Sequence, residues 1–565
     1  MAPSARPTLA LAAAALVGAW LRLGALDREG LWLDELFTVR AATRESWAAL
    51  IAELAADVHP PLWFFLLHLL PEGPDASWRV PSALVGLVGV ALAAALARSL
   101  AGGGTHGARA TLLAAALTAT APGLVLLDRE ARANAALSAA AVGLVLALVR
   151  GRSVAVVLVA AVLVNLHPFG PFVLAAAALF LYLDPGDGTG SPPGRGVLLL
   201  GAGALALLPW ASVLVGQADQ FAASPWYRPP PGDSVGWVLA ELADDQPGLW
   251  LGPLLGLGVA ARLEGPGERR GLVLAAAFVV GVVLLPQAAS YLWAPILRSR
   301  SALPLLPVVL VAASLGLARM GRPGVILGLV AATGQGLAAW SATRLEVRRE
   351  QWREAAAWAA PLVPPGGLVL ATHPQLWRHY LGEHVDLRDA ASLDVDAAPG
   401  AVVLLGHEPD PTALHARLGA TVLEEARFHG VWGARVGGFA RPLPLNVDDP
   451  ARGRADGTHA ELWGATSART PPLRARGACA VHVRAHEDAA GVEPAELRVR
   501  VVLDGVAVLD ERLAVGGAGV TAGAPLVHGE PDHNELVVEV AFTNDAVVDG
   551  ADRNAYLDEV RLDCR

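Results

Sequence analysis

Charged residues are scarce in this sequence, and their scarcity indicates the broad structural class of the protein. Only 17% of the 565 residues are charged while 54% are hydrophobic, and the mean hydropathy is +0.45. An ordinary soluble protein carries about 25% charged residues, so the composition indicates a membrane protein instead. The formal net charge of −10 argues against a nucleic-acid partner, because a phosphate-binding surface needs a basic face.

Cysteine is almost absent as well. The sequence has two cysteines, Cys479 and Cys564, and both lie in the polar C-terminal part of the chain. If that part is external, the pair can oxidise, and such a closure stabilises a fold by roughly 4 kcal/mol in the chain-entropy model. We therefore expect a disulfide that ties an early strand of the C-terminal region to the last one.

Long apolar runs fill the first 340 residues. A helix needs about 20 apolar residues to cross the hydrocarbon core of a bilayer. The first run follows Arg6 and is similar to a secretory signal, but no small-x-small cleavage site closes it before Arg22, so we predict a retained span. The sequence predicts about eleven spans: Thr8–Leu26, Pro81–Leu100, Ala110–Leu127, Ala133–Val149, Val154–Leu166, Phe169–Leu183, Gly196–Val215, Gly248–Ala261, Leu272–Tyr291, Ala302–Ala318 and Val325–Trp340.

Arginines in the connecting loops give the orientation. By the positive-inside tendency we assign one side to the cytoplasm, with Arg98, Arg109, Arg150, Arg152, Arg195, Arg262, Arg269, Arg270, Arg319 and Arg322. The other side also carries arginines: Arg28, Arg40, Arg44, Arg79, Arg129, Arg132, Arg228, Arg298 and Arg300. Arginines held outside, near the membrane surface, suit a lipid-linked phosphate, whose oxygens accept bidentate guanidinium bonds. This topology places the C-terminal region outside.

An acidic pair, Asp34-Glu35, stands between the first two spans, and Asp57 and His59 follow it. The segment Pro60–Leu70 is too short to span, so we expect a re-entrant or interfacial helix. An isolated acidic pair often only caps or solvates such a helix. Here, however, the stretch 128–132 puts further acids and arginines on the same face of the membrane.

Four motifs in this order resemble one family. They are the Trp32–Thr38 stretch; His59-Pro60-Pro61-Leu62 with Phe64, Phe65, Leu66 and His68; Arg79-x-Pro81-Ser82-Ala83-Leu84-x-Gly86; and Glu130-Ala131-Arg132. Over roughly residues 8–350 the chain is similar to bacterial glycosyltransferases of the protein mannosyltransferase type (family 39-like), within the GT-C class of polyprenyl-phosphate-sugar transferases. It departs from that pattern at Arg129, where the family usually has Gln, and at Ala133-Asn134, where an aromatic residue is common. These departures leave the donor's identity open.

The resemblance implies that Asp34, with Glu35 beside it, is the catalytic carboxylate. A hydroxyl is a poor nucleophile, and a carboxylate within hydrogen-bond reach can take its proton. The leaving group is already a phosphate, so no general acid is needed, in contrast to a glycosidase. The leaving phosphate does need its charge neutralised, by a divalent cation or by arginines.

The remaining site residues follow from the same resemblance. We expect His59 and Glu130 to orient a metal ion or the phosphate, and Arg132 and Arg300 to contact the donor phosphate. The alternatives are that His59 caps the Pro60–Leu70 helix and that Arg300 extends to the interface from the end of a span. The external loop Gln217–Gln246 carries Trp226 and Tyr227, which are typical of a membrane-interface belt and can equally line a sugar or lipid site.

The implied protein is a multi-pass glycosyltransferase of the bacterial inner membrane. It would transfer a sugar from a polyprenyl-phosphate donor to a hydroxyl of a carbohydrate, protein or lipid acceptor on the extracytoplasmic face. The alternative is a non-enzymatic glycan-binding receptor or a transporter. Transporters usually show internal repeats and broken helices at mid-membrane, and we find no convincing repeat.

The tail contains two further predicted domains after a transmembrane domain of residues 1–345. Residues 346–440 combine a helical stretch with apolar strands near 368–370 and 401–405, which predicts a small external α/β unit. Residues 455–565 contain β-like runs at 497–503, 507–509 and 536–542, with a hairpin turn at Asp504-Gly505. This pattern is typical of a β-sandwich.

The closing segment of the chain resembles calcium-dependent xylan-binding carbohydrate modules. The matching elements are Thr543-Asn544-Asp545 and Asp552-Arg553-Asn554. The resemblance implies Asp545, Asp552 and Asn554 as Ca²⁺ ligands, with Asp549 less secure, because Ca²⁺ takes six to eight oxygen ligands. The alternative is a solvated acidic turn, which is common on β-sandwiches.

Overall fold

The computed structural model describes most of the chain and divides it into two compact units. The units are Met1–Arg348 and Arg349–Arg565, and each is described by itself. The described residues are 5–184, 193–223, 230–263, 265–363, 368–389, 402–407, 421–437, 441–442, 445–463, 465–474, 479–487, 495–503, 505–515, 520–525, 535–543, 547–548, 551–552 and 554–564.

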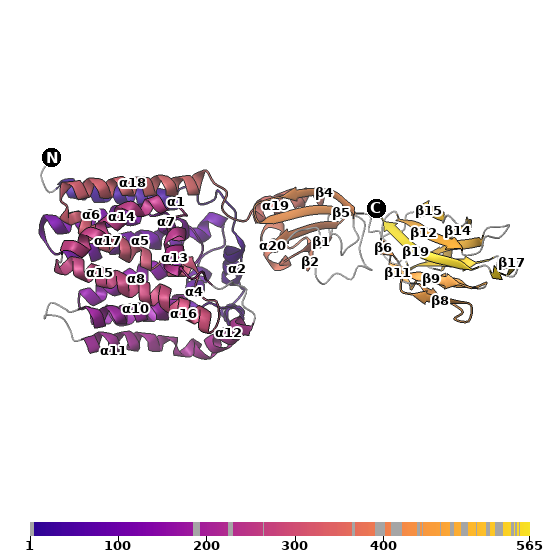
Figure 1. Ribbon diagram of the computed structural model, residues 1–565, viewed down its shortest axis with the longest axis horizontal. Coiled ribbons are helices and arrows are strands. Elements are labelled where there is room, and N and C mark those ends of the chain that lie inside the picture. The colour runs from indigo at the N-terminus through magenta and orange to yellow at the C-terminus, as the bar shows by residue number, and fades with distance from the viewer. Residues whose placement is uncertain are drawn as a thin grey trace. The chain divides into compact units, whose positions relative to one another are not determined.

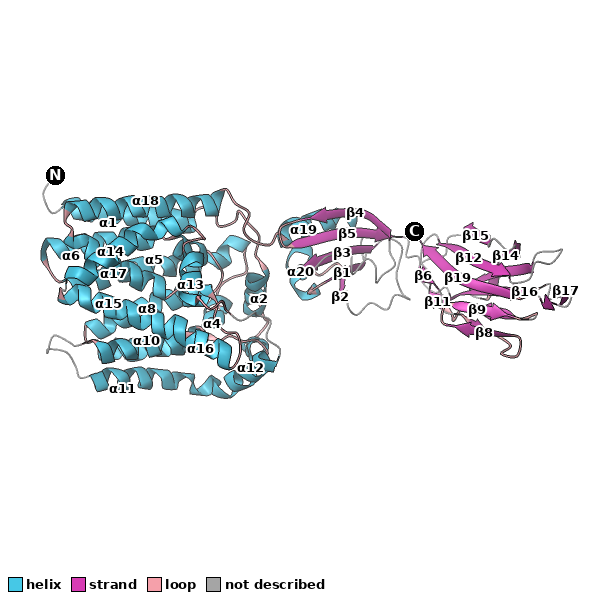
Figure 2. Ribbon diagram, in the orientation of Figure 1, coloured by secondary structure: helices cyan, strands magenta, loops and turns pink. Residues whose placement is uncertain are grey.

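The first unit is a bundle of helices, many of which lie side by side (Figures 1 and 2). Its helices are α1 (Ala5–Leu23), α2 (Leu33–Ala42), α3 (Trp47–Ala55), α4 (Leu62–His68), α5 (Asp75–Ala101), α6 (Gly104–Thr120), α7 (Pro122–Asp128), α8 (Asn134–Val149), α9 (Ser153–Leu166), α10 (Gly170–Leu183), α11 (Pro193–Ala204), α12 (Ala211–Ala223), α13 (Ser234–Leu242), α14 (Leu251–Leu263), α15 (Pro266–Val279), α16 (Leu285–Leu292), α17 (Leu305–Arg319) and α18 (Arg322–Arg344). Short 3₁₀ helices η1 (Leu205–Trp210), η2 (Pro247–Trp250) and η4 (Ser299–Ala302) and a π-helical segment η3 (Val280–Leu284) connect or interrupt them.

Small residues let these helices pack closely. Helix α17 is buried from Leu305 to Ala318 and forms the centre of the bundle. A side chain at Gly316 would run into the backbone of Gly256 on α14. Glycine and alanine at such contacts let backbones approach where hydrophobic burial gives little drive, as between helices in a bilayer.

Each predicted span lies mainly on helix in the structure. Fewer helices than the predicted eleven, however, meet the length and hydropathy expected of a membrane span. Among the described residues four helices are long and apolar enough to cross a membrane: Asp75–Ala101, Gly194–Ala223, Pro266–Leu292 and Arg322–Arg344. The bent pair Gly104–Thr120 and Pro122–Asp128 makes a fifth if counted as one span. Five further apolar helices are shorter, with 10–17 residues.

Two segments predicted to lie outside the spans contain helices. The segment Pro60–Leu70 contains a short helix, α4. The segment Gln217–Gln246 is not a continuous loop, because α12 extends to Ala223 and α13 begins at Ser234. Asp233 caps α13 by accepting the Gly236 N–H at 2.9 Å, so an Asp-Ser start signal was present in the sequence. Trp226 and Tyr227 lie outside the described residues.

The second unit begins with a mixed sheet of order β2-β1-β3-β5-β4. Its strands are β1 (Leu368–Ala371), β2 (Asp386–Asp389), β3 (Val402–His407), β4 (Thr421–Arg427) and β5 (Val431–Gly437), with helices α19 (Trp352–Ala359) and α20 (Pro374–Leu381) and a short turn η5 (Ala360–Leu362). Strand β1 pairs in parallel with β2 and β3, and β5 pairs antiparallel with β3 and β4. Helices and parallel strands near the two predicted apolar runs form an α/β arrangement.

Two six-stranded sheets follow, with orders β14-β13-β16-β10-β7 and β15-β12-β19-β9-β8, each joined by one short extra strand. Their strands are β6 (Arg441–Pro442), β7 (Asn446–Val447), β8 (Gly453–Asp456), β9 (His459–Leu462), β10 (Ser467–Arg469), β11 (Leu473–Arg474), β12 (Cys479–Glu487), β13 (Ala495–Leu503), β14 (Val506–Val515), β15 (Val520–Pro525), β16 (Glu535–Phe542) and β19 (Ala555–Cys564), and a separate pair is β17 (Val547–Val548) with β18 (Ala551–Asp552). Side chains from both sheets share one buried cluster, which includes Val481 and Val499.

The predicted hairpin turn joins β13 and β14, where Leu503 pairs with Val506 and Gly505 takes a φ of +81°. That left-handed φ is one that glycine adopts without strain. The backbones of Cys479 and Cys564 are direct antiparallel partners on β12 and β19. This register agrees with the predicted bridge, which remains a prediction.

Candidate functional site

Asp34 lies in the first turn of α2 and meets two arginines from distant parts of the first unit. Its Oδ2 atom is 2.8 Å from Arg300 Nη1 and 4.0 Å from Arg132 Nη2. The Asp34 side chain is 22% exposed, although its Oδ2 atom is itself buried. Three charged residues separated by up to 266 positions in the chain therefore form one cluster.

Arg132 is held in place by α2 and by His59. Its Nη1 donates to the Asp34 carbonyl oxygen at 3.2 Å and to Thr38 Oγ1 at 2.9 Å. Its Nη2 lies 3.0 Å from His59 Nε2. The guanidinium group therefore has little freedom to turn away from the cluster.

His59 connects Arg132 to a second carboxylate. A guanidinium group only donates, so His59 Nε2 accepts from Arg132 and the ring proton lies on Nδ1. Nδ1 is 2.9 Å from Asp57 Oδ2, where it donates. The chain Asp57, His59, Arg132, Asp34 and Arg300 is thus a continuous polar network.

The charges around Asp34 control its proton affinity. Burial raises the pKa of Asp34, but the positive charges of Arg132 and Arg300 outweigh burial, so the pKa falls below its ordinary value of 3.8. Asp34 is therefore ionised at neutral pH. With both arginines close, it is a weak base.

Glu35 faces a different environment, although it follows Asp34 directly. Consecutive helix residues point about 100° apart, because an α-helix has 3.6 residues per turn. Glu35 is fully buried, and Arg79 on α5 donates to it through Nε at 2.8 Å and Nη2 at 2.5 Å. Glu35 Oε1 also accepts the Ala131 N–H at 2.8 Å.

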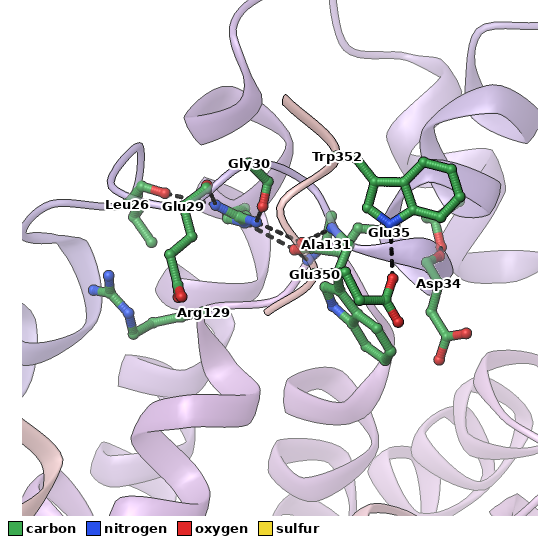
Figure 3. A network of polar contacts seen from close by, with 12 residues as sticks. Leu26, Glu29, Gly30, Asp34, Glu35, Arg129, Ala131, Glu350 and Trp352 are labelled. Atoms are coloured by element: carbon green, nitrogen blue, oxygen red, sulfur yellow. Dashed lines mark hydrogen bonds and ion pairs between the residues drawn. The ribbon is translucent and has the colours of Figure 1, made fainter. Parts of the chain in front are cut away.

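Arg79 uses its remaining donors on the loop before α2. Nη1 donates to the carbonyls of Leu26 and Glu29, and Nη2 to that of Gly30, each at 2.7 Å. Figure 3 shows these contacts around Glu35, with the Asp34 carboxylate pointing away from them. The predicted catalytic role of Glu35 therefore finds no support in its position, which fixes α2 to α5 and to the loop that carries Arg132.

The other residues of the Arg79-x-Pro81-Ser82-x-x-x-Gly86 motif have similar positioning contacts. Ser82 Oγ donates to the Arg132 carbonyl at 3.1 Å. Gly86 leaves room for the Asp128 carboxylate, which any Cβ at that position would displace. Asp128 pairs with buried Arg22 at 2.7 Å.

Arg129, the departure from the family pattern, lies away from the Asp34 cluster. Its Nη1 donates to the carbonyls of Leu21, Arg22 and Gly24 at 2.7–2.9 Å, and Nη2 donates to Ala25. These carbonyls belong to the C-terminal end of α1, which leaves them without helical partners. Arg129 therefore stabilises the end of α1.

A cavity of about 390 Å³ opens beside this cluster. Its charged lining residues are arginines, namely Arg132, Arg298 and Arg300, and His59 stands next to them. Its apolar wall is formed by Phe169, Phe172, Leu214, Phe221, Trp293 and Ile296. A cavity lined by both cations and aromatic and aliphatic side chains suits an anion attached to a hydrocarbon chain.

His167 also lines the cavity, although the sequence analysis did not select it. Its Nδ1 accepts the Phe169 N–H at 3.1 Å, so a neutral ring carries its proton on Nε2. Burial and the nearby positive charges of Arg132 and Arg300 lower its pKa well below 6.5. The sequence signal that could have identified His167 is its position in the short connection between two predicted spans, where a polar residue is expected at the end of the helix bundle.

Glu130 is buried, and its Oε2 accepts from Asn134 Nδ2 at 3.3 Å. Asn134 itself lines the cavity, whereas Glu130 does not. Within the described residues, no group of three or more His, Cys, Asp or Glu side chains is arranged to hold a metal ion. The expected divalent cation therefore stays a prediction, and the charged residues that line the cavity are arginines.

Two of the calcium ligands expected in the tail, Asp545 and Asp549, lie outside the described residues. Asp552 is on β18, where only its backbone is described, and Asn554 precedes β19.

Comparisons with known proteins show the fold. No protein family matches the sequence, and no curated protein does. ArnT from Cupriavidus metallidurans in the apo state is 14% identical, with 77% of this chain and 98% of ArnT covered and a TM-score of 0.53. The same protein bound to undecaprenyl phosphate gives 14%, the same coverage and 0.51. The chain therefore has an ArnT-like fold.

Two further similarities are weaker. The oligosaccharyltransferase AglB from Archaeoglobus fulgidus, in complex with an inhibitory peptide and a dolichol-phosphate, is 11% identical, with 70% of this chain and 69% of AglB covered and a TM-score of 0.45. The carbohydrate-binding module CBM36 in complex with calcium and xylotriose is 20% identical, with 22% and 87% covered and a TM-score of 0.14. Neither score is high enough to support an argument about this chain.

Proposed function

We propose that the protein is a membrane glycosyltransferase that takes a sugar from a polyprenyl-phosphate donor and transfers it to an acceptor hydroxyl on the extracytoplasmic face. The observation that carries the proposal is the cavity next to the Asp34 cluster, which is lined by both arginines and apolar side chains. A polyprenyl phosphate combines the same two properties, an anionic headgroup and a long hydrocarbon chain. The ArnT-like fold supports this reading, because one ArnT structure holds undecaprenyl phosphate.

The proposed reaction forms one bond and breaks one. The acceptor oxygen bonds to the anomeric carbon of the sugar while the bond from that carbon to the phosphate oxygen breaks. Asp34 takes the proton of the acceptor hydroxyl as general base. The electron pair of the broken bond stays on the phosphate, whose charge Arg132 and Arg300 stabilise at the cavity wall.

The other polar residues position these groups. His59 and Asp57 hold Arg132 at the cavity through the hydrogen bonds described above. Glu35 and Arg79 fix the start of α2, which carries Asp34. We assign no transfer step to Glu35 or Glu130.

The test of this function is cleavage of a donor in membranes that contain the protein. A polyprenyl-phosphate sugar labelled in the sugar is added, and the label that leaves the lipid-phosphate fraction is measured. The proposal predicts transfer of the label with release of polyprenyl phosphate. A protein that only binds or transports the lipid would leave the donor intact, and that result with a full panel of sugars would contradict the proposal.

A further inference from the structure

Arg300 belongs to two environments at once. Its guanidinium group makes the 2.8 Å ion pair with Asp34, and its side chain also lines the cavity. It lies in the short turn η4, where its Cζ is 5.3 Å from the centre of the Trp32 ring. The same cation is thus within reach of the carboxylate and of any anion in the cavity.

Arg132 differs from Arg300 in how it is held. Arg132 is fixed by Thr38, His59 and the Asp34 carbonyl, and its distance to the Asp34 carboxylate is 4.0 Å. Arg300 instead makes the short contact with that carboxylate, and its side chain is 25% exposed. A phosphate that enters the cavity therefore meets one anchored arginine and one whose close carboxylate partner is Asp34.

We propose that Arg300 is shared between Asp34 and the donor phosphate, so that donor binding draws Arg300 away from Asp34 and leaves the carboxylate able to accept a proton. A phosphate offers a guanidinium group two oxygens in bidentate geometry, which makes it a strong competitor for a single carboxylate contact. The inference rests on the proposed function, since it assumes that the cavity takes a phosphate.

The consequence is an order of events at the site. With Arg300 on Asp34, the carboxylate holds its charge but has a low affinity for a proton. Once Arg300 turns to the phosphate, less positive charge offsets the burial of the Asp34 carboxylate. The proton affinity of Asp34 therefore rises. The base is then active when a donor is in place, and the coupling is reciprocal: Asp34 must weaken phosphate binding as much as phosphate weakens the Asp34 pair.

The test measures binding of a polyprenyl monophosphate to the full chain in lipid nanodiscs. Asp34→Asn removes the competing charge and should tighten binding by about 5- to 150-fold, the usual range of a coupling between two sites. Asp34→Asn in an Arg300→Gln background should give no such gain, because the shared cation is absent. Glu53→Gln on α3 is the matched control, since it removes an equal charge that pairs with Arg40 and Arg44 rather than with Arg300.

Each outcome separates the inference from the function on which it rests. Unchanged or weaker binding by Asp34→Asn would overturn the sharing of Arg300, and so would an equal gain for Glu53→Gln or a gain that persists in the Arg300→Gln background. If neither the wild type nor any variant bound the lipid phosphate, the proposed function itself would fail, and the inference with it.

Discussion

At the scale of single residues, two neighbouring acids lie in different surroundings. Asp34 faces arginines at the cavity, and Glu35 is sealed in a network with Arg79 and backbone groups. The sequence placed both in the catalytic centre, because the pair looks equivalent until the position of Arg79 is known. Arg79 is 44 residues further along the chain, so this contact depends on the tertiary fold.

Substitution of Glu35 should therefore affect stability before chemistry. Glu35→Gln leaves Arg79 buried without its counter-charge, and breaking a buried ion pair costs about 3–5 kcal/mol. We expect a clear drop in the thermal unfolding temperature in detergent for Glu35→Gln, and none for Asp34→Asn. A Glu35→Gln protein with wild-type stability and no transfer activity would instead favour a catalytic role for Glu35.

The pH dependence of transfer should reflect the two environments of Asp34. The base must be ionised, and Arg132 and Arg300 hold the pKa of Asp34 below 3.8 against the effect of burial. The acid limb of kcat/KM, which reports the free enzyme, should therefore lie below that of an ordinary aspartate. The acid limb of kcat, which reports the donor complex, should lie at higher pH if Arg300 leaves Asp34. Coincident limbs in the two profiles would contradict this.

At the scale of elements, the helices of the first unit were largely predictable. Their apolar runs are long and closed by Gly, Pro or Arg, so α5, α8, α9, α10, α17 and α18 begin and end near the predicted residues. Short helices were harder to predict from the sequence. Helix α13, for example, has only nine residues, and its main local signal is the Asp233 cap inside a polar segment. Periodicity finds long elements well, whereas nine-residue helices depend on local caps and packing.

Helix α5 gives a test of packing near the site. A methyl group at Gly86 would collide with the Asp128 carboxylate, whereas one at Gly89 would lie 3.4 Å from the Ala139 Cβ, an ordinary contact. We expect Gly86→Ala to destabilise the protein by about 1–3 kcal/mol, the usual cost of overpacking. Gly89→Ala on the same helix is the control and should unfold near the wild-type temperature. Equal unfolding temperatures for both variants would contradict the close packing of Asp128 against α5.

At the scale of the whole molecule, the chain combines a helical unit with a second unit of mixed and antiparallel sheets. The change from apolar runs to short strands was visible in the sequence. Strand pairing was not: β6 and β7 join the two large sheets from residue 441 on, ahead of the predicted start at 455. Such long-range pairing leaves little local signal, because each two-residue strand is defined by its partner.

The two cysteines can report the compartment of the second unit. Because Cys479 and Cys564 are backbone partners on β12 and β19, an oxidising exterior should join them, whereas the cytoplasm would keep them reduced. We predict that mass spectrometry of protein alkylated in intact cells finds the linked peptides, and that they separate after reduction. Alkylation of both thiols before reduction would contradict the external location.

The most direct test of the account is the transfer rate of Asp34→Asn in membranes supplied with an accepted labelled polyprenyl-phosphate sugar and its acceptor. The account predicts that the amide, which keeps the shape of the side chain but cannot take a proton, lowers kcat by about 10²- to 10⁴-fold. Donor binding should persist, which separates lost chemistry from a lost site. A variant that transfers the sugar at the wild-type rate would contradict the claim that Asp34 activates the acceptor hydroxyl.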